Sequence, residues 1–185
     1  MRLRIRTMVL FSLIVALSLP AFAQTPTSES SRDATREKLR ALLETAGKRS
    51  DVNVTFKQST KQLYNFVGSM RDNMLNAESL EIVISVTPSD TIGFRVYPHY
   101  KGGYINVKKA SDSPGLMHKM LTFSDRNFLF WGADSTDDVF CGYTFTLESG
   151  FPDNAIVVVL RSIRNTDKFV GELRPFVDGS AAVVK

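Results

Sequence analysis

Two stretches between residues 80 and 97 alternate hydrophobic and polar positions. A period of two places the hydrophobic side chains on one side of a β-strand, so each stretch predicts a strand with one buried face. The turn residues Pro88-Ser89-Asp90 separate the two strands and predict a hairpin. The hydrophobic positions are Leu80, Ile82, Ile84 and Val86 in the first strand and Ile92, Phe94 and Val96 in the second.

Three further strands and a short helix are predicted between residues 101 and 147. Lys101-Gly102-Gly103 predicts a turn into a strand at residues 104–107, because glycine accepts the positive φ that tight turns need. Ser113-Pro114 predicts the start of a helix, which contains Leu116, Met117, Met120 and Leu121. Residues 128–131 and 139–147 predict two more strands, joined by a polar turn, and the hydrophobic row of the second is Val139, Cys141, Tyr143, Phe145 and Leu147.

Two helices are predicted before the first of these strands. Residues 33–46 carry a hydrophobic stripe, and Gly47 stands at the position of a C-cap glycine. Residues 60–74 also fit helical spacing, although Gly68 weakens a helix by about 1 kcal/mol relative to alanine. The alternative there is a strand at residues 64–67, and residues 52–56 fit a short edge strand. The two stripes are Leu39, Leu42, Leu43 and Ala46, and Leu63, Phe66, Val67, Met70 and Met74.

The last predicted element is a helix that begins near Pro152-Asp153. Its β-branched residues 156–160 would also suit a buried strand. A proline and an acidic residue suit a helix N-terminus, however, and the hydrophobic positions follow helical spacing. We therefore predict a helix that is interrupted at residues 165–167 and continues to Pro175. Its stripe is Ala155, Ile156, Val159, Leu160 and Ile163, followed by Phe169, Val170 and Leu173.

These elements predict an α+β two-layer sandwich. Its antiparallel five-stranded sheet carries packed helices in the order helix-β-β-β-helix-β-β-helix, with an extra N-terminal helix. Over residues 60–176 this order resembles the type III secretion chaperone-like fold, including its YbjN-like branch. In that fold a twisted antiparallel sheet packs helices on one face. The resemblance rests on element order alone, and it implies a non-catalytic, often dimeric domain that binds other polypeptides.

The first 23 residues have the three parts of a signal peptide. Arg2, Arg4 and Arg6 precede an apolar run at residues 8–19, and Ala21-Phe22-Ala23 is a small-x-small cleavage site. The run is too short for a comfortable membrane span, although an uncleaved anchor is the alternative. We expect cleavage after Ala23 and a periplasmic or secreted protein. Residues 24–32 would form a disordered leader, residues 33–177 a single α+β domain and residues 178–185 a flexible tail.

Charge and cysteine content narrow the classes of partner. The chain has a net charge of +4, which falls to +1 without the three arginines of residues 1–23. So balanced a chain gives no support for binding to nucleic acid or to a membrane after signal cleavage. Cys141 is the only cysteine, so no intramolecular disulfide can form. Its place in a hydrophobic row predicts a buried, unreactive thiol, with a thiol that pairs between molecules as the alternative.

The sequence shows no recognisable catalytic or metal-binding motif. Its two histidines, His99 and His118, lack the spacing of a metal pair, and we expect both to be structural. Residues 134–138 lack the glycine and glutamate of a calcium loop and predict a solvated turn. Ser149 lacks the flanking glycines of a hydrolase nucleophile. We therefore expect no catalytic residue, cofactor or metal.

Several strands are apolar on both sides, so hydrophobic side chains would also lie on the second face of the sheet, where something must cover them. Either the helix at residues 33–46 covers this face, or the face is an interaction surface. We expect Tyr97, Tyr104, Leu129 and Trp131 to contribute to such a surface, for a peptide or a homodimer. The sequence thus favours an exported, non-enzymatic protein- or peptide-binding domain. The alternative is a small-ligand carrier or an enzyme with a site near the Gly102-Gly103 turn, around His99, Tyr100 and Tyr104.

Overall fold

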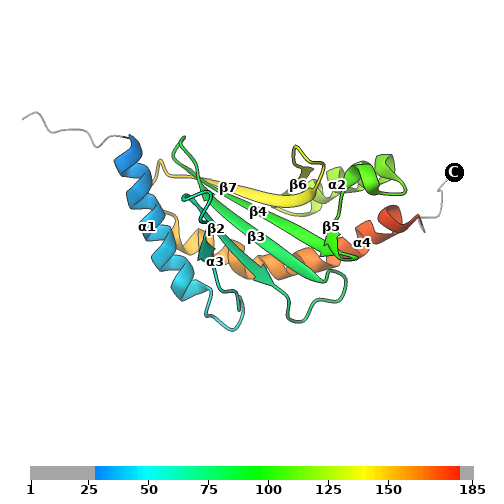
Figure 1. Cartoon of the computed structure of the whole chain (residues 1–185), viewed down its shortest axis with the longest axis horizontal. Helices are drawn as coiled ribbons and strands as arrows, with labels where there is room; N and C mark the ends of the chain where they lie inside the picture. Colours follow the sequence, from blue (N-terminus) through cyan, green and yellow to red (C-terminus); the bar gives the residue numbers. More distant parts are fainter. Residues whose placement is uncertain (1–27, 180–185) are drawn as a thin grey trace, which may run out of the picture.

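The computed structural model describes residues 28–179, and the predicted signal peptide at residues 1–23 lies outside this range. The described part has an α+β architecture in which helices pack against an antiparallel sheet (Figure 1). The helices are α1 (Ser28–Ala46), α2 (Ser113–Arg126), α3 (Asp153–Ser162) and α4 (Thr166–Asp178). The strands are β1 (Lys57–Gln58), β2 (Asn65–Met70), β3 (Ser79–Val86), β4 (Thr91–Tyr100), β5 (Gly103–Tyr104), β6 (Phe130–Ala133) and β7 (Val139–Thr146).

The sheet has seven strands in place of the five that the sequence predicts. Their order is β1-β2-β3-β4-β7-β6, and β5 pairs with the end of β4. Every pairing is antiparallel. The longest register joins β3 to β4, from Ser79 opposite His99 to Val86 opposite Ile92. The predicted hairpin is therefore confirmed, and it forms the centre of the sheet.

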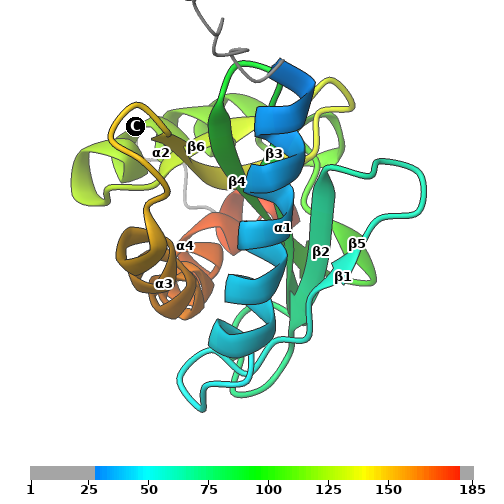
Figure 2. The same cartoon turned by 90° about the vertical axis from the view of Figure 1, so that its left-hand side faces the viewer.

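All four helices contribute to one hydrophobic core on the same face of the sheet. Figure 2 shows α1 beside α3 with α4 behind α3, and α2 packs near β6. The alternate residues Ile82, Ile84 and Phe94 are at most 2% exposed, as the period-two pattern predicts. From the helices, Leu39, Phe123, Ile156 and Leu173 join the same cluster.

The helix predicted at residues 60–74 does not form, and the alternative strand is correct. Strand β2 buries Phe66, Gly68 and Met70 on one side, and it pairs with β3 along its whole length. A Cβ at Gly68 would lie 2.5 Å from a methyl carbon of Val54 and 2.9 Å from the ring of Phe56. The glycine therefore occupies an inward position of the strand, where only the absence of a side chain lets the loop before β1 pack closely. A glycine at an inward position also hides the period-two pattern from a search for hydrophobic residues.

Of the two helices predicted before the central hairpin, only the first forms in the described chain, as α1. It begins at Ser28, so residues 28–32 of the predicted disordered leader are helical. Leu39, Leu43 and Ala46 enter the same core as the residues of α3, and so the helix does not cover the second face of the sheet. Gly47 closes the helix without a left-handed φ. A Cβ there would lie 2.2 Å from the carbonyl oxygen of Val54, so the position needs glycine for close packing.

Several predicted boundaries shift. Residues 52–56 form a loop, and the edge strand is β1. The strand predicted at residues 104–107 is reduced to β5 and is followed by a short 3₁₀ helix at Val107–Lys109. Helix α3 is confirmed, a 3₁₀ turn at Ile163–Asn165 follows it, and α4 runs through Pro175 to Asp178. Only residues 178 and 179 of the predicted tail are described, and α4 includes the first of them.

A buried carboxylate joins α4 to the loop before β3. Asp167 is 7% exposed, and its oxygens accept hydrogen bonds from the backbone N–H groups of Leu75, Asn76 and Ala77 at 2.7–3.2 Å. Burial alone would raise the pKa of Asp167, but these donors hold it below its ordinary value of 3.8. The charged carboxylate therefore stabilises the native connection between β2 and β3.

We expect Gly68→Ala to destabilise the protein by about 1–3 kcal/mol, because the added methyl group overpacks the contact with Val54 and Phe56. Urea unfolding followed by Trp131 fluorescence measures the change. Gly93→Ala is the matched control, since a Cβ at this position of β4 meets nothing within 4 Å. Equal destabilisation by both substitutions would contradict the close packing of Gly68.

We expect Asp167→Asn to lower the free energy of unfolding at pH 7 by about 1.5–3 kcal/mol, because a charged acceptor is lost. A depressed native pKa contributes stability above the ordinary value of 3.8 and loses it as the pH falls through the native value. The difference from the native protein should therefore shrink when urea unfolding is repeated at pH 3. Asp90→Asn, in the exposed turn after β3, is the control and should change stability by less than about 0.5 kcal/mol. A difference that is constant from pH 7 to pH 3 would count against the role of the charge.

Candidate functional site: a groove on the open face of the sheet

The sheet face opposite the helices carries a second set of side chains, and we call it the open face. In β4, Gly93, Arg95 and Tyr97 alternate with the buried residues Ile92, Phe94 and Val96. Across β3 and β4, Glu81 pairs with Tyr97 and Val83 pairs with Arg95. Because directly paired residues share a face, Glu81 and Val83 also lie on the open face. This face therefore combines charged, aromatic and small residues, in contrast to the aliphatic core face.

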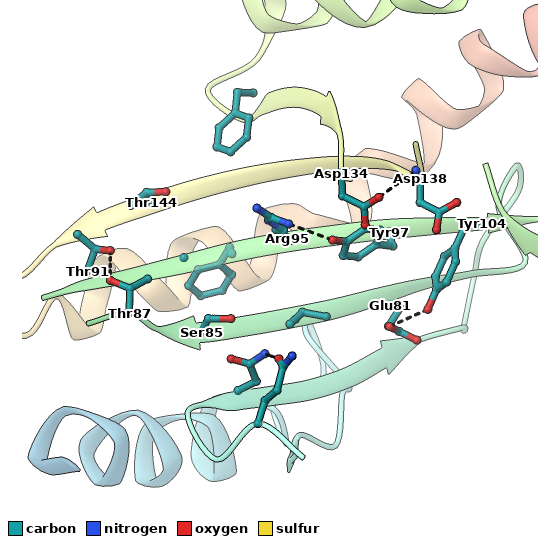
Figure 3. Close-up of a pocket in the computed structure, with 16 residues that line it drawn as sticks. Glu81, Ser85, Thr87, Thr91, Arg95, Tyr97, Tyr104, Asp134, Asp138 and Thr144 are labelled. Atoms are coloured by element: carbon teal, nitrogen blue, oxygen red, sulfur yellow. Dashed lines mark hydrogen bonds between the residues drawn. The ribbon is translucent and has the colours of Figure 1, made fainter. Parts of the chain in front are cut away.

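A groove of about 570 Å³ lies on the open face (Figure 3). Its lining extends across the sheet from Asn65 in β2 to Phe130 in β6, and along β4 from Thr91 to Tyr97. The segment of β4 alone is about 20 Å long at about 3.4 Å per residue. The groove is thus long enough for about six residues of extended chain, and the strand spacing of about 4.8 Å makes it about as wide as it is long.

The two ends of the groove differ in chemistry. One end presents hydroxyl groups from the four residues Ser85, Thr87, Thr91 and Thr144. The other end we call the acidic–aromatic end, and it consists of Glu81, Tyr97, Tyr104, Asp134 and Asp138. The groove therefore offers neutral hydrogen-bonding groups at one end and carboxylates beside aromatic rings at the other.

Hydrogen bonds fix the carboxylates of the acidic–aromatic end. The hydroxyl group of Tyr104 donates to Glu81 at 3.0 Å, and the side-chain amide of Asn106 donates to Asp138 at 2.8 Å. Asp134 accepts from the backbone N–H groups of Thr136 and Asp138 at 2.9 and 3.1 Å. The bonds to Asp134 and Asp138 give the turn between β6 and β7 a defined shape.

The pKa values of two groups follow from these contacts. Burial alone would raise the pKa of Asp134, but hydrogen bonds from Thr136, the Asp138 backbone and Tyr97 hold it below its ordinary value. Partial burial and the bond to Glu81 raise the pKa of Tyr104 to about 12. Asp134 therefore stays negatively charged and Tyr104 stays a hydrogen-bond donor throughout the physiological range.

Aromatic rings form a continuous cluster beside these carboxylates. The rings of Tyr97 and Tyr104 have centroids 5.6 Å apart, and Phe140 lies 5.7 Å from Tyr97. Phe130 contacts Phe140 at 5.8 Å, and the guanidinium of Arg95 lies 4.6 Å from the centre of the Phe140 ring. Arg95 and the neighbouring rings bury Phe140 to 6% exposure, although it lies on the open face.

The predicted interaction residues divide between the two faces. Tyr97 and Tyr104 lie on the open face and line the groove. Leu129 and Trp131 are only 2% and 6% exposed and belong to the core, where Trp131 packs edge to face against Phe123. Their assignment to an interaction surface is therefore wrong. Phe130 is 45% exposed and lines the groove.

The pairing register of β6 with β7 decides which side of β6 is buried, and the pattern within β6 does not reveal it. Trp131 pairs with Cys141, whose hydrophobic row was recognised as one face of its strand. Cross-strand partners share a face, so this pairing places Trp131 in the core and Phe130 and Phe140 on the open face. Alternation within β6 alone cannot choose between the two sides, because both are apolar.

His118 and Cys141 lie away from the groove, whereas His99 contacts its edge, with its ring centroid 4.4 Å from that of Tyr104. His118 is exposed on α2, while His99 lies with its Nε2 3.9 Å from Glu81 and does not line the groove. A hollow of about 360 Å³ beside the Gly102-Gly103 turn is lined by Tyr100 and Tyr104, and neither a histidine nor a carboxylate is among its lining residues. Cys141 is fully buried, which raises the pKa of its thiol to about 12.

The described residues contain neither a cluster for a metal ion nor a helix that could span a membrane. Within residues 28–179, no group of three histidine, cysteine, aspartate or glutamate side chains is arranged to hold a metal ion. None of the helices in this range is long and apolar enough to cross a membrane.

Comparisons with known proteins leave the groove as the main functional observation. No protein-family model matches the chain, and no curated protein sequence or solved structure matches it. The function is therefore inferred from the geometry and chemistry of the open face.

Proposed function

We propose that this protein is an exported, non-enzymatic domain that binds an extended polypeptide of another protein in the groove on its open face. The observation that carries the proposal is the one-sided packing of the helices. All four helices lie on one face, and the other bears a broad groove with exposed aromatic and hydrogen-bonding side chains. Export is part of the proposal because residues 1–23 have the pattern of a cleaved signal peptide.

The shape of the groove favours a polypeptide over a small ligand. Small-ligand sites are concave and enclose most of the ligand surface. This groove extends across the five neighbouring strands β2, β3, β4, β7 and β6 and about 20 Å along β4, and small residues such as Gly93 form part of its floor. An extended chain would place alternate side chains against the strands, where Tyr97, Arg95 and Thr144 offer aromatic and polar contacts.

The order of the elements also supports the proposal. Over residues 60–176 the predicted order begins with a helix at residues 60–74, which the structure replaces by β2. Counted from α1 instead, the described chain again has the order helix, three strands, helix, two strands, helix, apart from the short β1 and β5. The resemblance to type III secretion chaperone-like proteins rests on this order. Binding of another polypeptide is what that resemblance implies, and the open face offers a surface for it.

Filling the groove should weaken binding. Gly93 lies in its floor, and a Cβ there meets nothing within 4 Å, so Gly93→Tyr adds a ring without disturbing the core. The protein purified from cells that express the full chain is applied to a library of random twelve-residue peptides. We expect the selected peptides to bind Gly93→Tyr at least about tenfold more weakly, because the new ring occupies their site.

Val158→Lys is the matched control, since Val158 is 58% exposed on α3, on the opposite side of the molecule. This variant should bind the peptides as the native protein does. Equal binding by all three proteins would contradict the proposal. So would a native dimer that Gly93→Tyr converts to a monomer in sedimentation analysis, because a second copy of the chain would then occupy the open face.

A further inference from the structure

The acidic–aromatic end of the groove has an excess of negative charge. Glu81, Asp134 and Asp138 line it, and Arg95 is the only lysine or arginine among the residues of the groove. In contrast, the chain has a net charge of +4, or +1 without the three arginines of residues 1–23. The local sign is therefore opposite to that of the protein, and it favours a cationic group in the ligand.

Neutral donors hold these carboxylates in place without neutralising them. Tyr104 donates to Glu81 and Asn106 donates to Asp138, and both donors are uncharged. Within residues 28–179, no lysine or arginine nitrogen lies within 4.0 Å of the three carboxylates, and the one histidine contact is His99 at 3.9 Å from Glu81. The acidic groups are thus oriented by hydrogen bonds, while their charge is available to a ligand.

The aromatic rings supply the second half of a cation site. Tyr97 and Tyr104 stand between the carboxylates, and the faces of such rings attract cations. The same surface already holds one guanidinium in this manner, since Arg95 lies over the ring of Phe140 and its Nη1 is 3.4 Å from the hydroxyl oxygen of Tyr97. A second guanidinium on Tyr97 and Tyr104 would meet Glu81 and Asp138, which are not engaged by Arg95.

We propose that the acidic–aromatic end recognises a basic side chain of the bound polypeptide, arginine in first place. Arginine fits because its planar group stacks on aromatic rings and forms paired hydrogen bonds with carboxylates. The inference rests on the proposed function and adds the chemical class of its partner. The partner is a polypeptide with an arginine or lysine in its extended segment, and the hydroxyl end of the groove holds the neighbouring residues.

The test uses the peptides that the native protein selects from the random library. They should be enriched in arginine and lysine over aspartate and glutamate. Replacing the basic residue of the tightest binder by citrulline, which has nearly the shape of arginine without its charge, should weaken binding at least about tenfold in calorimetry. Glu81→Gln and Asp138→Asn should each weaken binding of the arginine peptide about three- to tenfold and leave the citrulline peptide unchanged.

Asp137→Asn is the matched control, because Asp137 lies in the same turn but already pairs with Lys108 at 2.7 Å and does not line the groove. It should leave binding of the arginine peptide unchanged. Selected peptides without basic residues, or equal affinity of arginine and citrulline peptides, would overturn this inference and leave the proposed function intact. An arginine preference that survives Glu81→Gln and Asp138→Asn would also overturn it, because the basic residue would then bind elsewhere. If no peptide is selected, both proposals fail.

Discussion

The antiparallel register of β3 and β4 is the constraint on which the rest of the structure depends. It places Ile82 opposite Val96 and Ile84 opposite Phe94 on the core face, and Glu81 opposite Tyr97 on the open face. A slip by one residue would exchange the two faces. Each buried aliphatic or aromatic side chain stabilises the fold by about 1.5–3 kcal/mol, so a slip would remove a stabilisation comparable to the total of about 5–15 kcal/mol of a typical domain. The hydrophobic row therefore fixes which residues can line the groove.

Close packing on the core side makes the open face possible. Helices α1, α3 and α4 lie together against the sheet. The loop at Val54 packs closely against Gly47, which follows α1, and against Gly68 in β2, because neither glycine has a side chain. Asp167 ties the connection between β2 and β3 to α4 through backbone hydrogen bonds. These contacts stabilise the sheet from one side only, and the groove residues are consequently free from any structural need to be hydrophobic.

The groove residues have a combination of properties that packing alone does not require. Carboxylates on a sheet surface are usually solvated or paired with basic residues, whereas Asp134 is held by backbone N–H groups of its own turn and Asp138 by the side-chain amide of Asn106. Phe140 is buried on this face under Arg95 and its aromatic neighbours, so the surface is rigid beside the carboxylates. A rigid surface with fixed polar groups binds an extended chain with less loss of conformational freedom than a mobile one would.

The sequence by itself determined the fold class, the central hairpin, the helix after Pro152 and the burial of Cys141, because each depends on a local period or on one hydrophobic row. It failed at residues 60–74, where Gly68 interrupts the strand pattern and the remaining hydrophobic residues also fit a helix. It placed Tyr97 and Tyr104 on the same face as Leu129 and Trp131, whereas the first two line the groove on the open face and the last two are buried in the core. Only the tertiary structure decided these points. Strand register sets which side of a doubly apolar strand is buried, and the contacts of Gly68 with Val54 and Phe56 connect segments whose proximity no local pattern contains.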